Sequence, residues 1–283
     1  MSIELKNEEE QGRADLHMHS VYSDGILQPE ALFKKAKISG LKAISITDHD
    51  NVEACIESHT LKAKYNIDFI NGIEFSCFED REYHILGYNI DIDNKALKKH
   101  IVSFREVRLL RAEKMLGKLD SMGVKLSMSA VLEQAGAAPL ARPHIGAVIV
   151  KEGYSKNLKN AFNKYLGDRS PAYCEKKHFA VSKAIDLINK CGGVAVLAHP
   201  GKVVAQDMLY KMIEMGLDGI EVIHPSHDNR LENYYETIAA QFWLLATGGS
   251  DYHGSREYDQ ANFGKFTVPY SVVESIRYLA GKG

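Results

Sequence analysis

The sequence has few of the features that mark secreted, membrane-bound or fibrous proteins. Its four cysteines lie far apart and form no CxxC pair, which excludes a disulfide framework and a thiolate zinc ribbon. No apolar run approaches the roughly 18 residues that a membrane span needs. The segment Met1–Glu10 is acidic and lacks the apolar core of a signal peptide. We therefore expect a cytoplasmic protein with no membrane partner.

An excess of one charge is also missing from the chain as a whole. The 283 residues include 35 Lys and Arg against 37 Asp and Glu, a net charge of −2. This balance argues against a general nucleic-acid coat or a polybasic membrane binder. Apolar residues make up 45% and charged residues 25% of the chain, which is ordinary for a globular protein and excludes wholesale disorder.

Short apolar runs alternate with amphipathic stretches along most of the chain. Seven runs are expected to form strands: 14–17, 43–47, 69–75, 84–88, 194–198, 219–223 and 243–247. Several are continuously apolar, as parallel strands buried on both faces are. Helices are expected between most of them, at 29–40, 51–65, 181–190, 206–215 and 230–240. The pattern predicts an α/β fold, either a parallel barrel or a doubly wound sheet.

The alternation stops between residues 97 and 177, where apolar residues recur at three- and four-residue steps. We expect this segment to be a small helical domain inserted into a discontinuous barrel made of 13–96 and 178–283. The segment has 16 Lys and Arg against 7 Asp and Glu, a net charge of +9, whereas the remainder has a net charge of −11. An acidic barrel and a basic insertion suit a site that holds cations on one side and an anion on the other.

The strongest local signal is DLHMHSVYSDG at residues 15–25. In an extended strand, residues i and i+2 face the same way, so His17 and His19 can point at one ion. A lone HxH pair is a weak signal, but further acidic and histidine residues stand at or just beyond the ends of expected strands. They are Asp24, His49, Glu74, His84, His199, Asp251 and His253.

These nine residues are expected to meet on one rim, because the carboxyl ends of barrel strands converge where active sites are built. Burying so many carboxylates and imidazoles without cations would be costly. Nine ligands exceed the about four that zinc takes, so two or three ions are implied. Imidazole and carboxylate ligands suit zinc, manganese or iron(II), and the residue types favour none of the three.

Six motifs in this order resemble the polymerase and histidinol phosphatase (PHP) superfamily. They are HMHSVYSDG, ITDHD, GIEFS, YHILGY, AHP and GGSDYHG. The inserted segment, with ARPHIG and YLGDRSPAY, resembles the branch of small bacterial PHP phosphoesterases that act on nucleotides. The resemblance implies a distorted seven-stranded TIM-like barrel with a trinuclear metal centre on its rim.

The resemblance also implies how the nine residues share the ions. One ion would be held by His17, His19, Glu74 and Asp251. A second would take Glu74 as a bridge, with His84 and His199. A third would take Asp24, His49 and His253. Glu74 and Asp251 are thus expected catalytic residues, and His227, which follows a barrel strand, is expected to touch the substrate or the leaving group.

The expected chemistry is hydrolysis by a hydroxide that bridges two ions, since each cation lowers the pKa of bound water. The resemblance implies a nucleotide phosphomonoester as substrate, a nucleoside 5′-monophosphate or 3′,5′-bisphosphate, with short RNA 5′ ends as an extension. One alternative is a histidinol-phosphate phosphatase, and another is a metal-binding regulatory module without turnover. An exonuclease acting mainly on polynucleotides is less favoured, because the acidic barrel would repel long nucleic acid. No obligate protein partner is indicated.

Residues that bind the substrate anion are expected in the insertion. Pro143 is a plausible first residue of a helix, which places Arg142 and His144 at a helix N-terminus, where free N–H donors and partial positive charge favour anions. The planar guanidinium of arginine suits bidentate phosphate binding. The expected phosphate-binding residues are Arg142 and His144, with Arg169, Lys176 or Lys177 nearby.

Overall fold

The computed structural model describes residues 12–175 and 178–281. The chain folds as two compact units. The first combines Met1–Lys98 with Phe179–Gly283, and the second is Lys99–His178.

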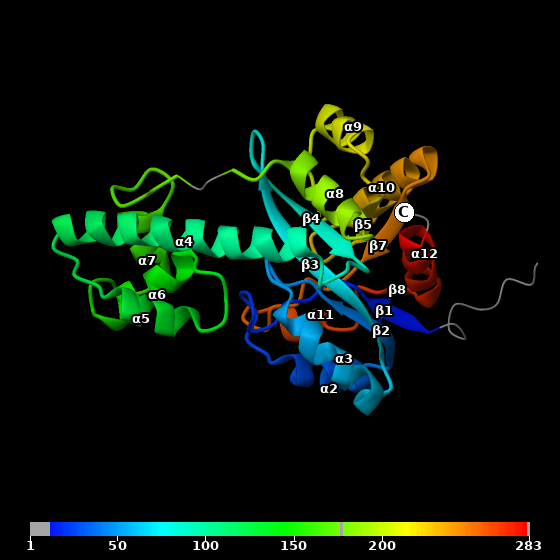
Figure 1. Cartoon of the computed structure of the whole chain (residues 1–283), viewed down its shortest axis with the longest axis horizontal. Coiled ribbons are helices and arrows are strands. Elements are labelled where there is room, and N and C mark those ends of the chain that lie inside the picture. Colours follow the sequence, from blue (N-terminus) through cyan, green and yellow to red (C-terminus); the bar gives the residue numbers. More distant parts are fainter. Residues whose placement is uncertain (1–11, 176–177, 282–283) are drawn as a thin grey trace, which may run out of the picture. The chain divides into compact units, whose positions relative to one another are not determined.

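The first unit is built on a nearly closed barrel of eight strands (Figure 1). Their spatial order is β7 (Leu245–Gly248), β6 (Gly219–Ile223), β5 (Val194–Leu197), β4 (Glu82–Tyr88), β3 (Asp68–Phe78), β2 (Leu41–Ile46), β1 (Arg13–Asp15) and β8 (Val268–Pro269). The strands β1 to β7 match the seven expected runs. The additional strand, β8, is only two residues long, too short to show a period in the sequence, and pairs antiparallel with β1.

One strand runs against the expected direction. The pairs β1–β2, β2–β3, β5–β6 and β6–β7 are parallel, but β4 is antiparallel to both β3 and β5. Residues 79–81 alone connect β3 to β4, and a parallel pair would need a crossover of about a dozen residues or more. The prediction of a barrel with parallel strands throughout is therefore wrong for β4. The reversal brings the first residues of β4 to the rim where β3 ends.

Backbone hydrogen bonds join the segments that follow β1 and β7. The N–H of Asp251 donates to the carbonyl of His17 at 2.9 Å, and the N–H of His19 donates to the carbonyl of Tyr252 at 2.8 Å. Gly249 permits this approach, because a Cβ there would stand 2.4 Å from the backbone nitrogen of His17. Two segments more than 200 residues apart in sequence are thus fixed side by side at the rim.

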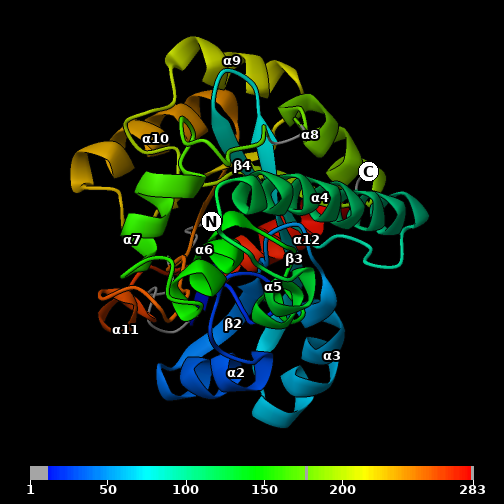
Figure 2. The same ribbon diagram turned by 90° about the vertical axis from the view of Figure 1, so that its left-hand side faces the viewer.

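Helices surround the barrel, as Figure 2 shows from the side. They are α2 (Pro29–Ile38), α3 (Glu53–Tyr65), α8 (Val181–Lys190), α9 (Gln206–Glu214), α10 (Asn229–Phe242) and α12 (Tyr270–Ala280), with the short α11 (Asp259–Asn262). A cluster of buried apolar residues packs around the barrel strands and includes Leu16, Ile70, Leu86, Val196 and Ile276. This rigid core holds the strand ends that carry the site.

The second unit is helical and has a core of its own. The long helix α4 (Lys95–Ser121) leads into it, followed by α5 (Met128–Ala135), α6 (Arg142–Lys151), α7 (Leu158–Ala161) and the π-helical turn η1 (Phe162–Leu166). Met115, Leu119, Val131 and Ile149 are among its buried residues. No helix among the described residues is long and apolar enough to cross a membrane.

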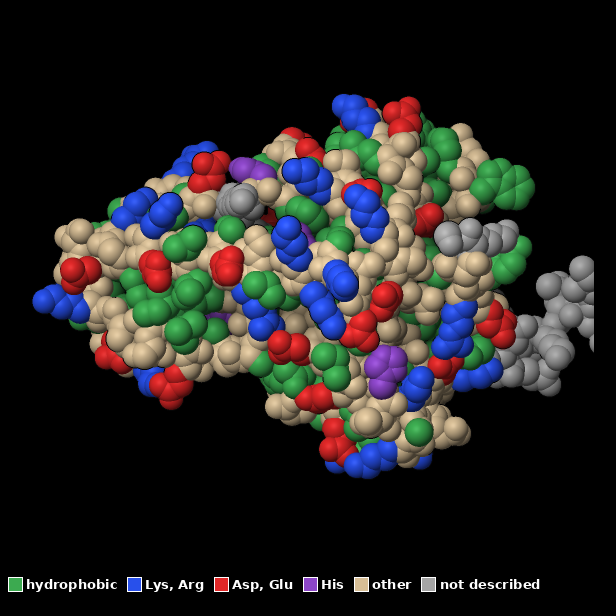
Figure 3. All heavy atoms as spheres, viewed as in Figure 1, with side chains coloured by type: hydrophobic (Ala, Val, Ile, Leu, Met, Phe, Trp, Pro, Cys, Tyr) green, Lys and Arg blue, Asp and Glu red, His purple; other side chains and the backbone are tan. Residues whose placement is uncertain are grey.

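On the face of the molecule drawn in Figure 3, basic and acidic side chains are interspersed.

Candidate metal centre

Four buried side chains at the rim form a first cluster. His17 and His19 follow β1, Glu74 lies within β3 and Asp251 follows β7. The Nε2 atoms of the two histidines are 3.3 Å apart, and each lies 3.2–3.4 Å from Glu74 Oε2 and from Asp251 Oδ1. Ligand atoms about 2.0–2.1 Å from a tetrahedral ion lie about 3.3–3.4 Å from one another. The spacing of His17, His19 and Glu74 therefore fits ligation of one ion, and Asp251 Oδ1 lies at similar distances from both histidines.

The Oε2 atom of Glu74 adds a second observation that fits a cation. This buried oxygen has no hydrogen-bond partner among the described residues, although ring nitrogens of His17, His19 and His49 lie 3.2–3.4 Å away. A carboxylate oxygen without a partner is costly to bury. A cation between these atoms would remove that cost.

The other carboxylate oxygen of Glu74 faces a second cluster. Its Oε1 lies 2.8 Å from His84 Nδ1 and 3.0 Å from His199 Nε2, and these two nitrogens are 3.3 Å apart. His84 lies at the reversed start of β4, and His199 follows β5 with a positive φ of 27°. Glu74 thus presents one oxygen to each cluster, as a bridging ligand does.

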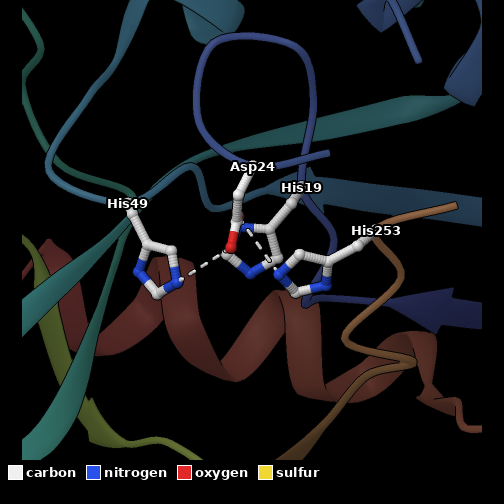
Figure 4. Close-up of side chains that lie close together, drawn as sticks. All are labelled: His19, Asp24, His49 and His253. Atoms are coloured by element: carbon white, nitrogen blue, oxygen red, sulfur yellow. Dashed lines mark ion pairs between the residues drawn. The ribbon is translucent and has the colours of Figure 1, made fainter. Parts of the chain in front are cut away.

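A third cluster surrounds Asp24. In Figure 4 its carboxylate points toward the rings of His19, His49 and His253. Asp24 Oδ1 lies 3.1 Å from His253 Nε2 and 3.5 Å from His19 Nδ1, and Oδ2 lies 4.0 Å from His49 Nε2. The side chain of Asp24 is 52% exposed, so this cluster is the most open of the three. All nine residues expected on the rim are therefore brought together there.

The carboxylates and imidazoles of this centre shift one another's pKa values. Burial lowers the pKa of His17, but the carboxylates of Glu221, Glu74 and Asp251 outweigh it and hold that pKa well above its ordinary value. Burial raises the pKa of Glu74, but the imidazoles around it hold that pKa well below its ordinary value. In the absence of a cation, the carboxylates thus hold protons on imidazoles. A metal ion must displace such protons to bind.

Comparisons with known proteins show the family of this chain. The family model described as PHP domain matches residues 15–168. The chain belongs to the PHP domain family. A 3′,5′-nucleoside bisphosphate phosphatase of Chromobacterium violaceum is 32% identical over 253 residues, which cover 86% of this chain and 88% of the relative. The 5′-3′ exoribonuclease Rnm of Salmonella typhimurium is 30% identical over 247 residues, which cover 84% of each.

A solved structure shows the same likeness in space. A chain from Bifidobacterium adolescentis, assigned as a metal-dependent phosphoesterase, is similar with a TM-score of 0.82 and 28% identity. The likeness covers 94% of this chain and 96% of that one. The likeness in fold to this phosphoesterase therefore covers residues of both units.

Glu221 is a residue of this PHP centre that the sequence reasoning missed. It is fully buried on β6, where Oε1 accepts a hydrogen bond from His17 Nδ1 at 2.9 Å and Oε2 accepts one from the N–H of His199 at 2.7 Å. The first bond leaves the lone pair of His17 Nε2 for the first cluster, as carboxylate partners of metal-binding histidines do. A glutamate inside the otherwise apolar strand GIEVI was the available signal.

We predict that Glu221→Gln lowers the affinity for the most tightly bound ion about 10- to 100-fold, because the amide holds His17 less firmly in the required tautomer. A competition titration with a fluorescent chelator measures the change. Glu274→Gln, at an exposed position of α12, is the matched control and should leave the affinity unchanged. An unaltered affinity in Glu221→Gln would contradict the orienting role.

Arg256 is a second missed residue, and nothing in its sequence context distinguished it. Its Nη1 donates to Asp251 Oδ2 at 2.7 Å, and its Nη2 lies 3.1 Å from His253 Nε2. The guanidinium therefore contacts two of the nine rim residues directly.

His227 lies near the rim, and the backbone contacts both of its ring nitrogens. Its Nδ1 donates to the carbonyl of Val222 at 2.8 Å, and its Nε2 accepts from the N–H of Gly201 at 3.0 Å. Burial lowers its pKa, which keeps the ring neutral. Both ring nitrogens are thus used by the backbone, and a contact of His227 with the substrate stays a prediction. His227 holds the loop that follows His199.

The expected phosphate-binding residues belong to the second unit. Arg142 is the first residue of α6, and its Nη1 donates to Asp168 Oδ1 at 2.5 Å and to the carbonyl of Leu166 at 3.2 Å. His144 Nδ1 accepts the N–H of Ala141 at 3.1 Å. The helix N-terminus therefore lies where the sequence placed it. Arg169 is exposed, whereas Lys176 and Lys177 lie outside the described residues.

Proposed function

We propose that this PHP protein is a phosphoric ester hydrolase that releases phosphate from a nucleotide phosphomonoester at a centre of three divalent cations. The observation that carries the proposal is the position of Glu74, whose two oxygens face separate clusters of imidazoles. Divalent cations bound there would lower the pKa of a bound water and neutralise charge on the phosphoryl group.

The residues that would hold the cations fall into three groups, and Glu74 belongs to two of them. The first group is His17, His19, Glu74 and Asp251, the second is Glu74, His84 and His199, and the third is Asp24, His49 and His253. The spacing in the third group brings His19 close as well. Nitrogen and oxygen ligands without thiolate suit zinc, manganese or iron(II).

Cysteine chemistry is disfavoured at this rim. Cys55 is buried beneath it, where its thiol lies 3.3 Å from the carbonyl of Gly72, and burial raises its pKa to about 12. The thiolate is the nucleophilic form of cysteine, so Cys55 stays inert. The three clusters consist of imidazoles and carboxylates, which suits attack by water.

The nucleotide class is supported by the relatives and by charge. Two relatives of about 30% identity or more act, by their names, on nucleoside bisphosphates and on RNA. The net charge of +9 on residues 97–177 favours an anionic substrate, and Arg142 and His144 remain its proposed phosphate-binding residues. We favour a 3′,5′-bisphosphate or a 5′-monophosphate of a nucleoside. RNA 5′ ends are a second candidate, favoured by the exoribonuclease relative.

A substrate panel tests the proposal. Mn²⁺-loaded protein is expected to release phosphate from a nucleoside 3′,5′-bisphosphate or 5′-monophosphate faster than from histidinol phosphate, and EDTA should abolish the release. A 5′-phosphorylated RNA in the same panel separates the two nucleotide candidates. Faster turnover of histidinol phosphate would overturn the nucleotide assignment. If metal-replete protein hydrolyses no ester in the panel, the alternative of a metal-binding regulatory module is favoured.

A further inference from the structure

The guanidinium of Arg256 is held at the edge of the metal centre. Besides its contact with Asp251 Oδ2, Nη1 lies 3.3 Å from the carbonyl oxygen of Asp251. The backbone N–H of Arg256 donates to Asp259 Oδ2 at 3.0 Å, and Gly254, with φ of +79°, makes the turn that returns the chain. The side chain is 35% exposed. One edge of the Arg256 guanidinium thus contacts Asp251 and His253, while part of the side chain is exposed to solvent.

The contact with His253 is incompatible with a cation on that histidine. His253 Nδ1 donates to the carbonyl of Asp251 at 2.8 Å, so Nε2 is the ring nitrogen that can bind a cation. A cation on Nε2 would occupy the position that faces Arg256 Nη2, so the two cannot share this nitrogen. Asp24 Oδ1, 3.1 Å from the same nitrogen, shows that this position belongs to the third cluster.

The contact with Asp251 is compatible with a bound cation. Asp251 Oδ1 faces the Nε2 atoms of His17 and His19, whereas Oδ2 faces Arg256. The two oxygens therefore serve different partners. Arg256 can stay anchored through Nη1 while Nη2 is released from His253.

We propose that Arg256 is a phosphate-binding residue of this centre. Its released Nη2 edge would donate to a phosphoryl oxygen of the substrate while Asp251 holds Nη1. A guanidinium is suited to this role because its donors lie in a planar fork that matches phosphate oxygens. The inference rests on the proposed function, since it assigns a partner to the substrate's phosphate.

Binding of inorganic phosphate to Mn²⁺-loaded full-length protein tests the inference without requiring turnover. Arg256→Ala is expected to weaken phosphate binding in isothermal calorimetry about 10- to 100-fold, and to raise KM for the best ester similarly. The phosphate affinity of Arg256→Lys should lie between those of the native protein and Arg256→Ala, because lysine keeps the positive charge but lacks the planar pair of donors. Metal content by mass spectrometry should be unchanged. Arg230→Ala, at an exposed position of α10, is the control.

Three outcomes would overturn the inference. Unchanged phosphate affinity in Arg256→Ala, with or without tighter ion binding, would mean that the arginine at most competes with the third cation. A loss of metal in Arg256→Ala and Arg256→Lys would mean that it acts only through the ligands. If the metal-loaded native protein does not bind phosphate, then phosphate is not a ligand of this centre. If phosphate binds and Arg256→Ala weakens it while no ester turns over, the inference stands and the proposed function fails.

Discussion

Glu74→Gln is expected to lower phosphate release at least about a thousandfold and to reduce bound metal by more than one ion per chain. The carboxylate bridges two clusters, with Oε2 3.2–3.4 Å from His17 and His19 Nε2 and Oε1 2.8–3.0 Å from His84 and His199. Glutamine has no negative charge, and its amide nitrogen would face imidazole lone pairs in one cluster or the other. A thousandfold loss corresponds to about 4 kcal/mol of transition-state stabilisation.

Metal analysis after desalting, together with the rate of phosphate release in Mn²⁺, measures both effects. Glu274→Gln, which removes an exposed carboxylate from α12, should keep the full metal content and rate. His17→Ala should reduce the metal content by about one ion, because its Nε2 faces the first cluster alone. Full metal content in an inactive Glu74→Gln protein would show that Glu74 is not a bridging ligand.

The positions of the rim residues could be predicted because strand geometry is periodic. His17 and His19 share a face by the two-residue repeat, and Glu74, His199 and Asp251 lie at or beyond the last residues of apolar runs. Barrel strands then bring these ends together whatever their separation in sequence. The direction of β4 could have been predicted too, because residues 76–83, which separate the two expected runs, are too few for a crossover.

Other parts of the centre depend on contacts that the sequence does not display. Glu221 stands in a strand pattern that shows its burial but not its bond to His17. Arg256 lies in a loop whose path depends on the turn at Gly254 and on the bond to Asp259. His227 follows a strand near the rim as expected, and the backbone of Gly201 contacts its Nε2. Proximity to the rim was predictable, whereas the partner of each ring nitrogen was not.

Metal loading is expected to stabilise the protein strongly. A cation that binds only the folded state at 100 times its dissociation constant adds about 2.7 kcal/mol per site. For domains of roughly this size, 1 kcal/mol raises Tm by about 2–4 °C, so one saturated site should raise Tm by about 5–10 °C. The structural reason is the centre itself, where Glu74 Oε2 is buried without a hydrogen-bond partner among the described residues.

The size of this shift is expected to depend on pH. Burial lowers the pKa of His19, but the nearby carboxylates of Asp251 and Glu74 outweigh it and raise that pKa from 6.5 to about 10. A folded-state pKa above the unfolded value stabilises the metal-free chain below about pH 6.5, and this contribution fades as the pH rises toward 10. A cation replaces the proton on such an imidazole. The metal-induced rise in Tm should therefore grow from pH 6 to pH 8.

Thermal unfolding of EDTA-treated protein at pH 6, 7 and 8, with and without Mn²⁺, measures this dependence. Glu74→Gln should lose most of the metal-induced shift at every pH, whereas Glu274→Gln should retain it. A shift that grows as the pH falls would contradict displacement of protons from the imidazoles. A shift of equal size in Glu74→Gln would place the stabilising ions elsewhere on the chain, away from the three clusters on which the proposed hydrolysis depends.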